Sequence, residues 1–194
     1  MTVYNEIGDD MSFLMLMLLA VTQATTVNPA DIPEMPSGSK DAVLYAPIKD
    51  EVLSVERGDL IKTKRMGNVQ LFSIYCPEKD EPLYDKARDF TKSLIVGKSV
   101  ELEIEPSAPK DLNGNWRAVV WLLDSKGERR CINKEIVAEG YAKVIIFPMS
   151  VFNTALWLTT EKEAKRNKKG IWGLSPAEFK KIKGIQDLRE KEGF

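Results

Sequence analysis

The stretch RGDLIKTKRMGNVQLFSIYCPE, residues 57–78, decides the fold class of this 194-residue chain. Apolar and polar residues alternate in LIKTKR and again in NVQLFSIY, and a Gly-Asn turn joins the two runs. Alternation on both sides of a short turn predicts an antiparallel β-hairpin. Arg57-Gly58-Asp59 precedes the hairpin as a turn, and Cys76-Pro77-Glu78 follows it as a loop.

Strands and helices alternate after this hairpin. The spacing of apolar residues predicts strands at 99–105 and 116–123 and helices at 85–96, 132–140 and 153–169, with a further helix from Ser175. Asn153 is the expected N-cap of the long helix, and Gly170 is its expected C-terminal stop. This order predicts an α+β fold: a five-stranded OB-type β-barrel with about three packed helices, an N-terminal arm and a C-terminal helix.

The composition is that of a soluble globular protein, with 43% hydrophobic and 29% charged residues. The chain has no histidine, which excludes histidine-based metal sites and the commonest general base. Cys76 and Cys131 match no zinc spacing and are expected to be two reduced thiols, with a single disulfide left open if the protein is exported. Acidic residues dominate residues 1–60 and basic residues dominate 160–194, which indicates either electrostatic steering of nucleic acid or solvated helix faces.

Residues 11–30 carry no charge, and their apolar core is the run from Phe13 to Val21. This run is shorter than the ~20 residues of a membrane-spanning helix, and it is close in length to a signal-peptide core of ~7–15 residues. The acidic residues that precede it are atypical of a signal peptide. A targeting or anchoring segment and an arm that packs on another protein both remain open. A membrane-associated or organellar location, mitochondrial or secretory, is favoured over the cytosol.

Two motifs near the C-terminus complete the pattern: INKEIVAEGYAKV at 132–144 and EKEAKRNKKGIW at 161–172. Together with Gly58-Asp59 and Cys76-Pro77-Glu78, their order resembles the staphylococcal nuclease family, also called thermonuclease-like domains, from about Asp50 to Trp172. The resemblance implies three parts: an N-terminal segment and linker at 1–40, a nuclease-like OB-fold domain at 41–174 and a helical extension at 175–194.

The resemblance also implies an active site that this chain carries only in part. The family holds calcium with two carboxylates, orients water with a glutamate and grips phosphate with two arginines. Asp59 matches the first carboxylate and Glu78 the glutamate, but Tyr75 stands at the second carboxylate. Gln70 and Asn115 stand at the two arginines, so both phosphate clamps lack their charge. Asp59 and Glu78 also suit a turn and a loop for backbone reasons alone.

Four basic residues remain candidates for phosphate contact. Arg117 lies two residues after Asn115, on the same face of the strand, and a two-residue shift in register would bring it to the missing clamp. Lys62, Lys64 and Arg65 either contact nucleic acid or form the solvated face of the hairpin.

These substitutions favour a non-catalytic nuclease-like domain, a pseudoenzyme that serves as a binding or structural subunit of a larger, membrane-associated or mitochondrial assembly. Protein partners are expected, nucleic acid and a membrane reached through residues 11–24 are alternatives, and no cofactor is expected unless the site is active with calcium. The alternatives are a divergent metal-dependent nuclease that uses Asp59, Glu78 and Arg117, and a binder of single-stranded nucleic acid.

Overall fold

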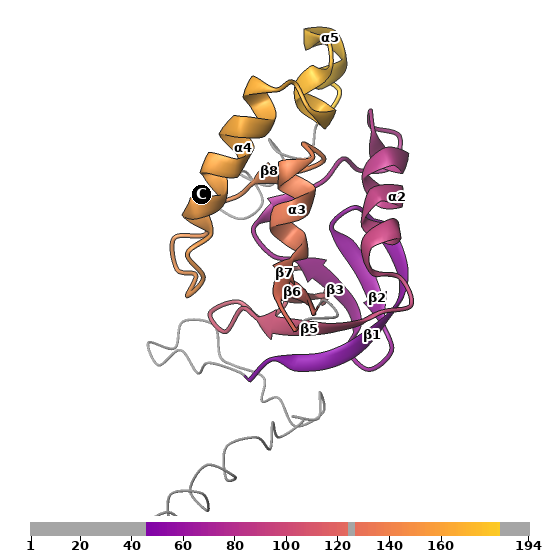
Figure 1. Cartoon of the computed structure of the whole chain (residues 1–194), viewed down its shortest axis with the longest axis vertical. Coiled ribbons are helices and arrows are strands. Elements are labelled where there is room, and N and C mark those ends of the chain that lie inside the picture. Colours follow the sequence, from indigo (N-terminus) through magenta and orange to yellow (C-terminus); the bar gives the residue numbers. More distant parts are fainter. Residues whose placement is uncertain (1–45, 124–126, 183–194) are drawn as a thin grey trace, which may run out of the picture.

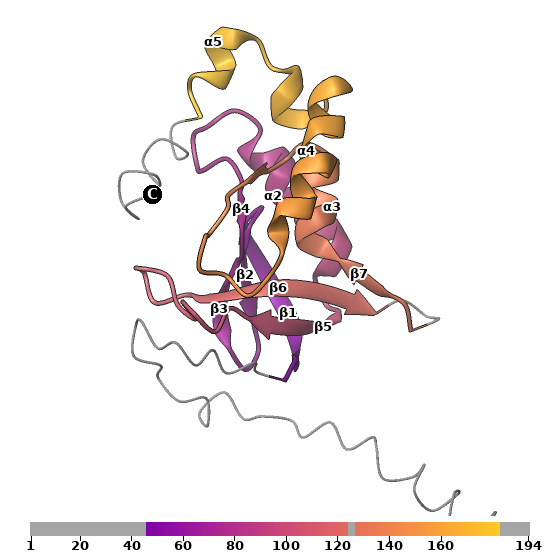
Figure 2. The same ribbon diagram turned by 90° about the vertical axis from the view of Figure 1, so that its left-hand side faces the viewer.

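Five strands close into a β-barrel in the computed structural model, which describes residues 46–123 and 127–182. Their order is β3-β2-β1-β5-β6, and a parallel pairing of β3 with β6 closes the barrel (Figures 1 and 2). The strands are β1 (Ile48–Arg57), β2 (Leu60–Thr63), β3 (Gly67–Leu71), β5 (Ser99–Ile104) and β6 (Trp116–Leu123). A further strand, β7 (Arg129–Cys131), pairs with β6 outside the barrel, and β4 (Ile74–Tyr75) pairs with β8 (Lys143–Val144). The predicted α+β OB-type fold is confirmed.

The hairpin of β2 and β3 forms with the expected alternation. Its register pairs Ile61 with Val69, and both side chains are fully buried, whereas Lys62 faces solvent opposite Asn68. The same alternation continues along β5, where Val100, Leu102 and Ile104 enter the core. Period-two burial is what a barrel strand requires, because one face lines the core and the other faces water.

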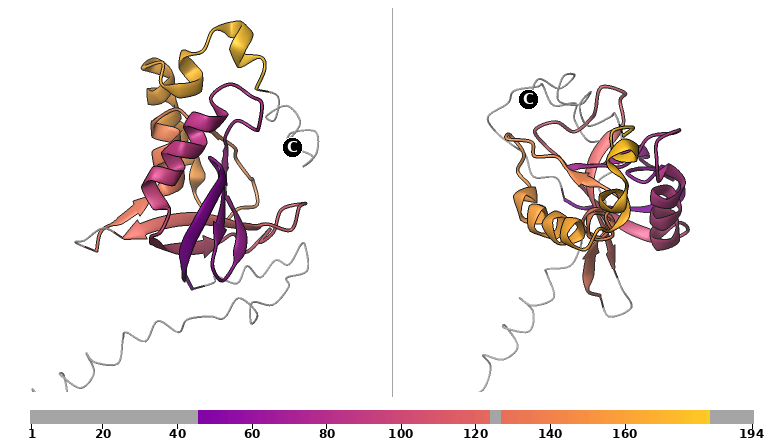
Figure 3. Two further views of the ribbon diagram at one scale, coloured as in Figure 1. Left: turned by 90° about the vertical axis from the view of Figure 1, so that its right-hand side faces the viewer. Right: turned by 90° about the horizontal axis from the view of Figure 1, so that it is seen from above.

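The described residues also form four α-helices and two short 3₁₀ turns. The helices are α2 (Tyr84–Ile95), α3 (Ile132–Ala138), α4 (Trp157–Arg166) and α5 (Pro176–Phe179), and the 3₁₀ turns are η2 (Thr154–Leu156) and η3 (Gly170–Gly173). Helix α3 lies between α2 and α4 and packs against β6, while α5 lies beyond the far end of α4 (Figures 1 and 3).

Asn133 fastens α3 to the barrel. Its side chain is fully buried, and its Oδ1 accepts a hydrogen bond from the Val120 amide at 2.9 Å. Its Nδ2 donates to the carbonyl oxygens of Phe72 at 2.9 Å and Ala118 at 3.4 Å. The asparagine of the 132–144 motif therefore provides hydrogen-bond partners for backbone groups of β6 and of the segment after β3.

The two glycines of the C-terminal motifs meet in space. Gly140 and Gly170 both have positive φ, and the amide of Ile171 donates to the Gly140 carbonyl at 2.9 Å. A Cβ atom on Gly140 would lie 2.3 Å from the Lys169 carbonyl oxygen, and one on Gly170 would lie 2.2 Å from the Gly140 carbonyl oxygen. Only glycine permits this approach, which brings the end of α3 against the end of α4.

The helix predicted over 153–169 is divided in the structure. The 3₁₀ turn η2 comes first, and α4 ends at Arg166. Asn153 stands at the N-cap position of η2, as predicted, but its side chain makes no capping hydrogen bond. Lys168, directly after the C-cap, has positive φ, and α4 ends three residues earlier than predicted. Ser175, in contrast, forms the expected capping box with Glu178 at the start of α5.

Residues 1–45, which include the apolar segment 11–24, lie outside the described part of the chain. In the described ranges, none of the helices combines the length and the apolar character needed to span a bilayer.

Candidate functional site

A cavity of about 210 Å³ opens beside the end of β3, at the place where the resemblance puts the active site. Four of the residues singled out in the sequence line it: Gln70, Tyr75, Glu78 and Arg117. Asp59 and Asn115 are not among its lining residues. The complete lining consists of Arg57, Gln70, Leu71, Phe72, Ser73, Ile74, Tyr75, Glu78, Asp111, Leu112, Asn113, Arg117, Ile145 and Phe147.

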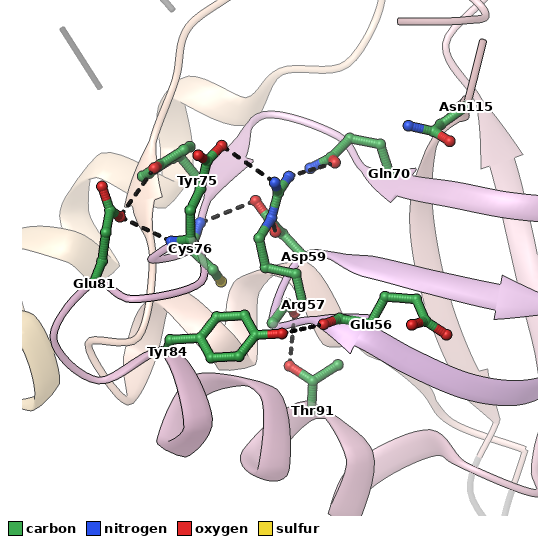
Figure 4. A network of polar contacts seen from close by, with 12 residues as sticks. Glu56, Arg57, Asp59, Gln70, Tyr75, Cys76, Glu81, Tyr84, Thr91 and Asn115 are labelled. Carbon is green, nitrogen blue, oxygen red and sulfur yellow. Dashed lines mark hydrogen bonds and ion pairs between the residues drawn. The ribbon is translucent and has the colours of Figure 1, made fainter. Parts of the chain in front are cut away.

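Arg57 lines this cavity, and its guanidinium lies at the centre of a network of polar contacts (Figure 4). Its Nε donates to Asp59 Oδ1, its Nη2 donates to Gln70 Oε1 at 2.9 Å, and its Nη1 lies 3.4 Å from Glu78 Oε1. Arg57 ends β1 and Asp59 lies in the turn two residues later, which brings the two side chains within hydrogen-bonding distance. Burial alone would lower the pKa of Arg57, but the charge and hydrogen bond of Asp59, helped by Glu78, raise it above its ordinary value.

Asp59 is fully buried, and each of its carboxylate oxygens has a partner. Oδ1 accepts from Arg57, and Oδ2 accepts from the Cys76 amide at 2.9 Å. These bonds join the turn after β1 to the loop after β4. A buried carboxylate needs such compensation, since the desolvation of an unpaired charge costs several kcal/mol.

Tyr75 is turned into the structure and keeps its proton. The residue is 3% exposed, and its hydroxyl donates to Glu81 Oε2 at 3.2 Å, the same oxygen that accepts from the Glu78 amide at 2.8 Å. Burial, together with the charges of Glu78 and Glu81, raises the pKa of Tyr75 well above its ordinary value. The ring also packs with Ile171 and Ile182, so Tyr75 serves the packing of the C-terminal region.

Arg117 reaches the cavity from its own position on β6. It pairs with Gln70 across the parallel junction of β3 and β6, is 8% exposed, and places its guanidinium 5.3 Å from the centre of the Phe147 ring. The structure therefore brings Arg117 and Glu78 to one cavity, while Asp59 stays behind Arg57.

Asn115 belongs to a closed turn and not to the cavity. Its Nδ2 donates to Asp111 Oδ2 at 2.9 Å, and its amide and that of Asn113 donate to Asp111 Oδ1. This hydrogen-bonded turn holds the loop before β6, and Figure 4 shows Asn115 well apart from the Arg57 cluster.

The basic residues of the hairpin lie away from the cavity. Lys62 is exposed on β2, and Lys64 Nζ lies 3.2 Å from Glu51 Oε2 in the turn at the far end of that strand. Arg65 Nη1 donates to the Lys49 carbonyl at 3.1 Å. None of the three lines the cavity.

The arrangement does not fit a calcium ion of the kind the resemblance implies. Calcium takes ~6–8 oxygen ligands, with carboxylates among them. Here both oxygens of Asp59 are engaged, a guanidinium lies between Asp59 and Glu78, and Tyr75 offers a neutral hydroxyl that points to Glu81. Over residues 46–123 and 127–182, no three or more His, Cys, Asp or Glu side chains form a group suited to a metal.

Arg57 is the residue that sequence reasoning missed. The sequence predicts a turn at Arg57-Gly58-Asp59, and a turn does not by itself indicate an ion pair between its first and third residues. The signal in the sequence is weak, because Arg57 and Asp59 flank a glycine in a turn, where a spacing of two residues does not fix the direction of either side chain. Asp111 was missed for a similar reason, since its role depends on backbone amides two and four residues later.

Comparisons with known proteins agree with this fold. The family model described as "Staphylococcal nuclease homologue" matches residues 68–173, more than half of the chain. Staphylococcal nuclease domain-containing protein 1 of Schizosaccharomyces pombe is 28% identical, over 82% of this chain and 18% of that protein. An uncharacterized protein of Methanocaldococcus jannaschii is 31% identical, over 46% of this chain and 42% of that protein. The chain thus spans less than half the length of either relative.

Proposed function

This chain belongs to the staphylococcal nuclease homologue family, and from that premise we propose that its domain is non-catalytic and acts as a binding or structural subunit of a larger assembly. One observation carries the proposal: the Arg57 guanidinium makes ion pairs with both Asp59 and Glu78. The two carboxylates that match the family's metal-binding and water-orienting residues thereby share one cation that the chain itself supplies.

The charge of Arg57 explains why this arrangement opposes catalysis. A metal ion placed between Asp59 and Glu78 would have to displace a guanidinium that is hydrogen-bonded to Asp59 and to Gln70. Displacement would leave that cation desolvated and without its partners, which costs several kcal/mol. Glu78 Oε1 also lies 3.4 Å from Nη1 of this guanidinium, so a cation that belongs to the chain stands beside both carboxylates.

The phosphate clamps give independent support. Gln70 uses its Oε1 to accept from Arg57, and Asn115 uses its amide to close the turn with Asp111. Each clamp group that is lost from a phosphoryl-transfer site typically costs on the order of 10²–10³ in rate. We therefore expect no measurable turnover of nucleic acid.

The experiment restores the missing groups in two steps. The variant Gln70→Arg/Tyr75→Asp/Asn115→Arg keeps Arg57, and a second variant adds Arg57→Ala. Single-stranded DNA and RNA are incubated with wild type and both variants in millimolar calcium or in chelator. Wild type and the triple variant are expected to stay inactive. The quadruple variant, which adds Arg57→Ala, is expected to gain calcium-dependent cleavage.

Two results would overturn the proposal. Cleavage by the wild-type protein that disappears in Glu78→Gln would show that the site is an active nuclease. Calcium-dependent cleavage by the triple variant would show that the Arg57 ion pairs do not block the site. Cleavage by wild type that persists in Glu78→Gln is attributed to a contaminant, and the assay is then repeated on material purified until that activity is gone.

A divergent nuclease is the second candidate, favoured by the presence of Arg117 and Glu78 in one cavity. In that case Arg117 would bind the phosphate and Glu78 would act on the water. The candidate requires that Arg117→Gln abolish the same activity that Glu78→Gln abolishes, with Lys62→Gln as the matched control on a surface away from the cavity.

A further inference from the structure

The segment between β8 and α4 presents an uncharged, apolar surface. No charged residue lies between Lys143 and Glu161, although charged residues make up 29% of the chain. We call residues 146–156 the apolar loop. Four of its large side chains are exposed, by the following fractions: Ile146 41%, Met149 82%, Val151 39% and Leu156 68%. Contiguous exposed apolar side chains of this kind mark a contact surface more often than free surface.

The apolar loop is held in place by its other side chains. The rings of Phe147 and Phe152 pack on Phe72, with centroid separations of 4.8 and 6.1 Å. The hydroxyl of Ser150 donates to the buried Glu105, and the hydroxyl of Thr154 donates to Ser73 at 3.1 Å. A surface fixed from inside loses little conformational entropy when something binds to it.

One segment of the same chain has the complementary chemistry. Residues 13–21, FLMLMLLAV, are apolar without interruption, and no charge occurs from 11 to 30. Such a run is as unfavourable in water as the apolar loop is, so burying each against the other removes both surfaces from solvent. Long leucine and methionine side chains adapt well to an irregular apolar surface.

The register of the barrel directs the chain toward this surface. Strand β1 is antiparallel to β5 and pairs Glu51 with Ser99 and Ile48 with Leu102. The chain that precedes Ile48 therefore arrives on the side of Ile104 and Glu105, and Glu105 is the residue that binds Ser150 of the apolar loop. Residues 22–45 separate the apolar run from the described domain and reach at most about 80 Å when extended, more than the loop requires.

We propose that residues 13–21 pack against the apolar loop of their own chain. At about 1 μM protein, a segment tethered at an effective concentration of about 1 mM is favoured about 1,000-fold over the same segment of another chain. The arm then covers the loop in the free protein. This contact is independent of whether the Arg57 cavity is catalytic.

Photocrosslinking in the full chain tests the contact. Met149 is replaced by the photoreactive benzoylphenylalanine, and light and heavy isotope-labelled protein are mixed before illumination. Mass spectrometry is expected to find Met149 linked to residues 11–24 of the same isotope form. The control places the probe at Leu123, which is also exposed. Leu123 lies on β6 six residues, or about 20 Å, from Arg117, and Arg117 is the β6 residue that contacts the Phe147 ring of the apolar loop. That position is expected to yield no such link.

The arm is then altered without touching the described domain. The variant Leu16→Asp/Leu18→Asp is expected to lose at least nine-tenths of the Met149 crosslink and to bind an apolar-surface dye several-fold more strongly, while its far-UV circular dichroism stays as in wild type. Crosslinks that join only light to heavy chains would assign the loop to a second copy and overturn the proposal. So would a Met149 crosslink to lipid, with the arm released, in phosphatidylcholine vesicles, or the absence of any crosslink to residues 11–24.

Discussion

Replacing Arg57 by methionine is expected to destabilise the domain strongly. Methionine keeps the apolar stem and removes every donor, so Asp59 would remain fully buried with a single hydrogen bond from the Cys76 amide. Breaking a buried ion pair by removing one partner typically costs about 3–5 kcal/mol. At about 2–4 °C per kcal/mol for a domain of this size, Tm should fall by roughly 6–20 °C.

Circular dichroism melts of the full chain measure the effect. The matched control is Arg88→Met on α2, because Arg88 pairs with the exposed Asp85 and Asp89 and its loss should change Tm little. The double variant Arg57→Met/Asp59→Asn removes the stranded charge and should recover a substantial part of the lost Tm.

Equal melting of wild type and Arg57→Met would refute the reasoning, since it would mean that Asp59 needs no cation. A double variant that melts below Arg57→Met would also contradict it, because the buried negative charge would then not be the source of the loss.

Three further predictions follow from other features. Wild type should melt at the same temperature in millimolar calcium and in chelator, whereas Arg57→Ala/Tyr75→Asp should gain a calcium-dependent rise in Tm, since Asp59, Glu78 and the new carboxylate would then lack an internal cation. Gly170→Ala should lower Tm far more than Gly97→Ala, because both glycines have positive φ but only Gly170 meets a carbonyl oxygen, 2.2 Å from the added Cβ. Burial raises the pKa of Cys131 to about 11, so the folded state favours the neutral thiol. The stability from Cys131 is therefore complete below the unfolded pKa near ~8.5 and is lost toward pH 11, and Cys131→Ala should flatten the fall in urea-unfolding free energy over that range by up to about 1.4 kcal/mol per pH unit.

Each of these has a clear contrary outcome. A calcium-induced rise in the Tm of wild type would show that other oxygens complete a metal site. Equal Tm losses for Gly170→Ala and Gly97→Ala would locate the cost in backbone conformation alone. An unchanged alkaline slope in Cys131→Ala would assign the pH dependence to other groups, of which Tyr75 and the fully buried Cys76 also have raised pKa values.

The barrel was predictable because β2, β3 and β5 alternate between apolar and polar residues and a glycine marks the hairpin turn. The burial of Ile61 and Val69 follows from the alternation of apolar and polar residues immediately around them in the sequence. The sequence shows the two motifs that contain Gly140 and Gly170 but does not indicate that these glycines touch, because a close approach of two backbones produces no pattern of side chains. The early end of α4 depends on positive φ at Lys168, which lysine does not signal.

In the candidate site, too, the residue types could be predicted from the sequence and their contacts could not. The sequence shows directly that Tyr75, Gln70 and Asn115 replace the charged residues of the family. It does not show which neighbours these three side chains contact. Asn115 donates a hydrogen bond to Asp111, and Gln70 accepts one from Arg57. Both contacts depend on the direction of the side chains and not on their spacing in the sequence. Arg117 entered the cavity because β3 and β6 pair in parallel, a closure that joins strands distant in the sequence.

The bond between Arg57 and Asp59 has a consequence for how the domain responds to its surroundings. A turn closed by a dissociable ion gains stability with the logarithm of that ion's concentration. A cation built into the chain is present once per molecule under all conditions and cannot be removed by dilution or by a chelator. The junction between β1 and the loop after β4 therefore keeps the same partner in any compartment, whatever the supply of divalent ions.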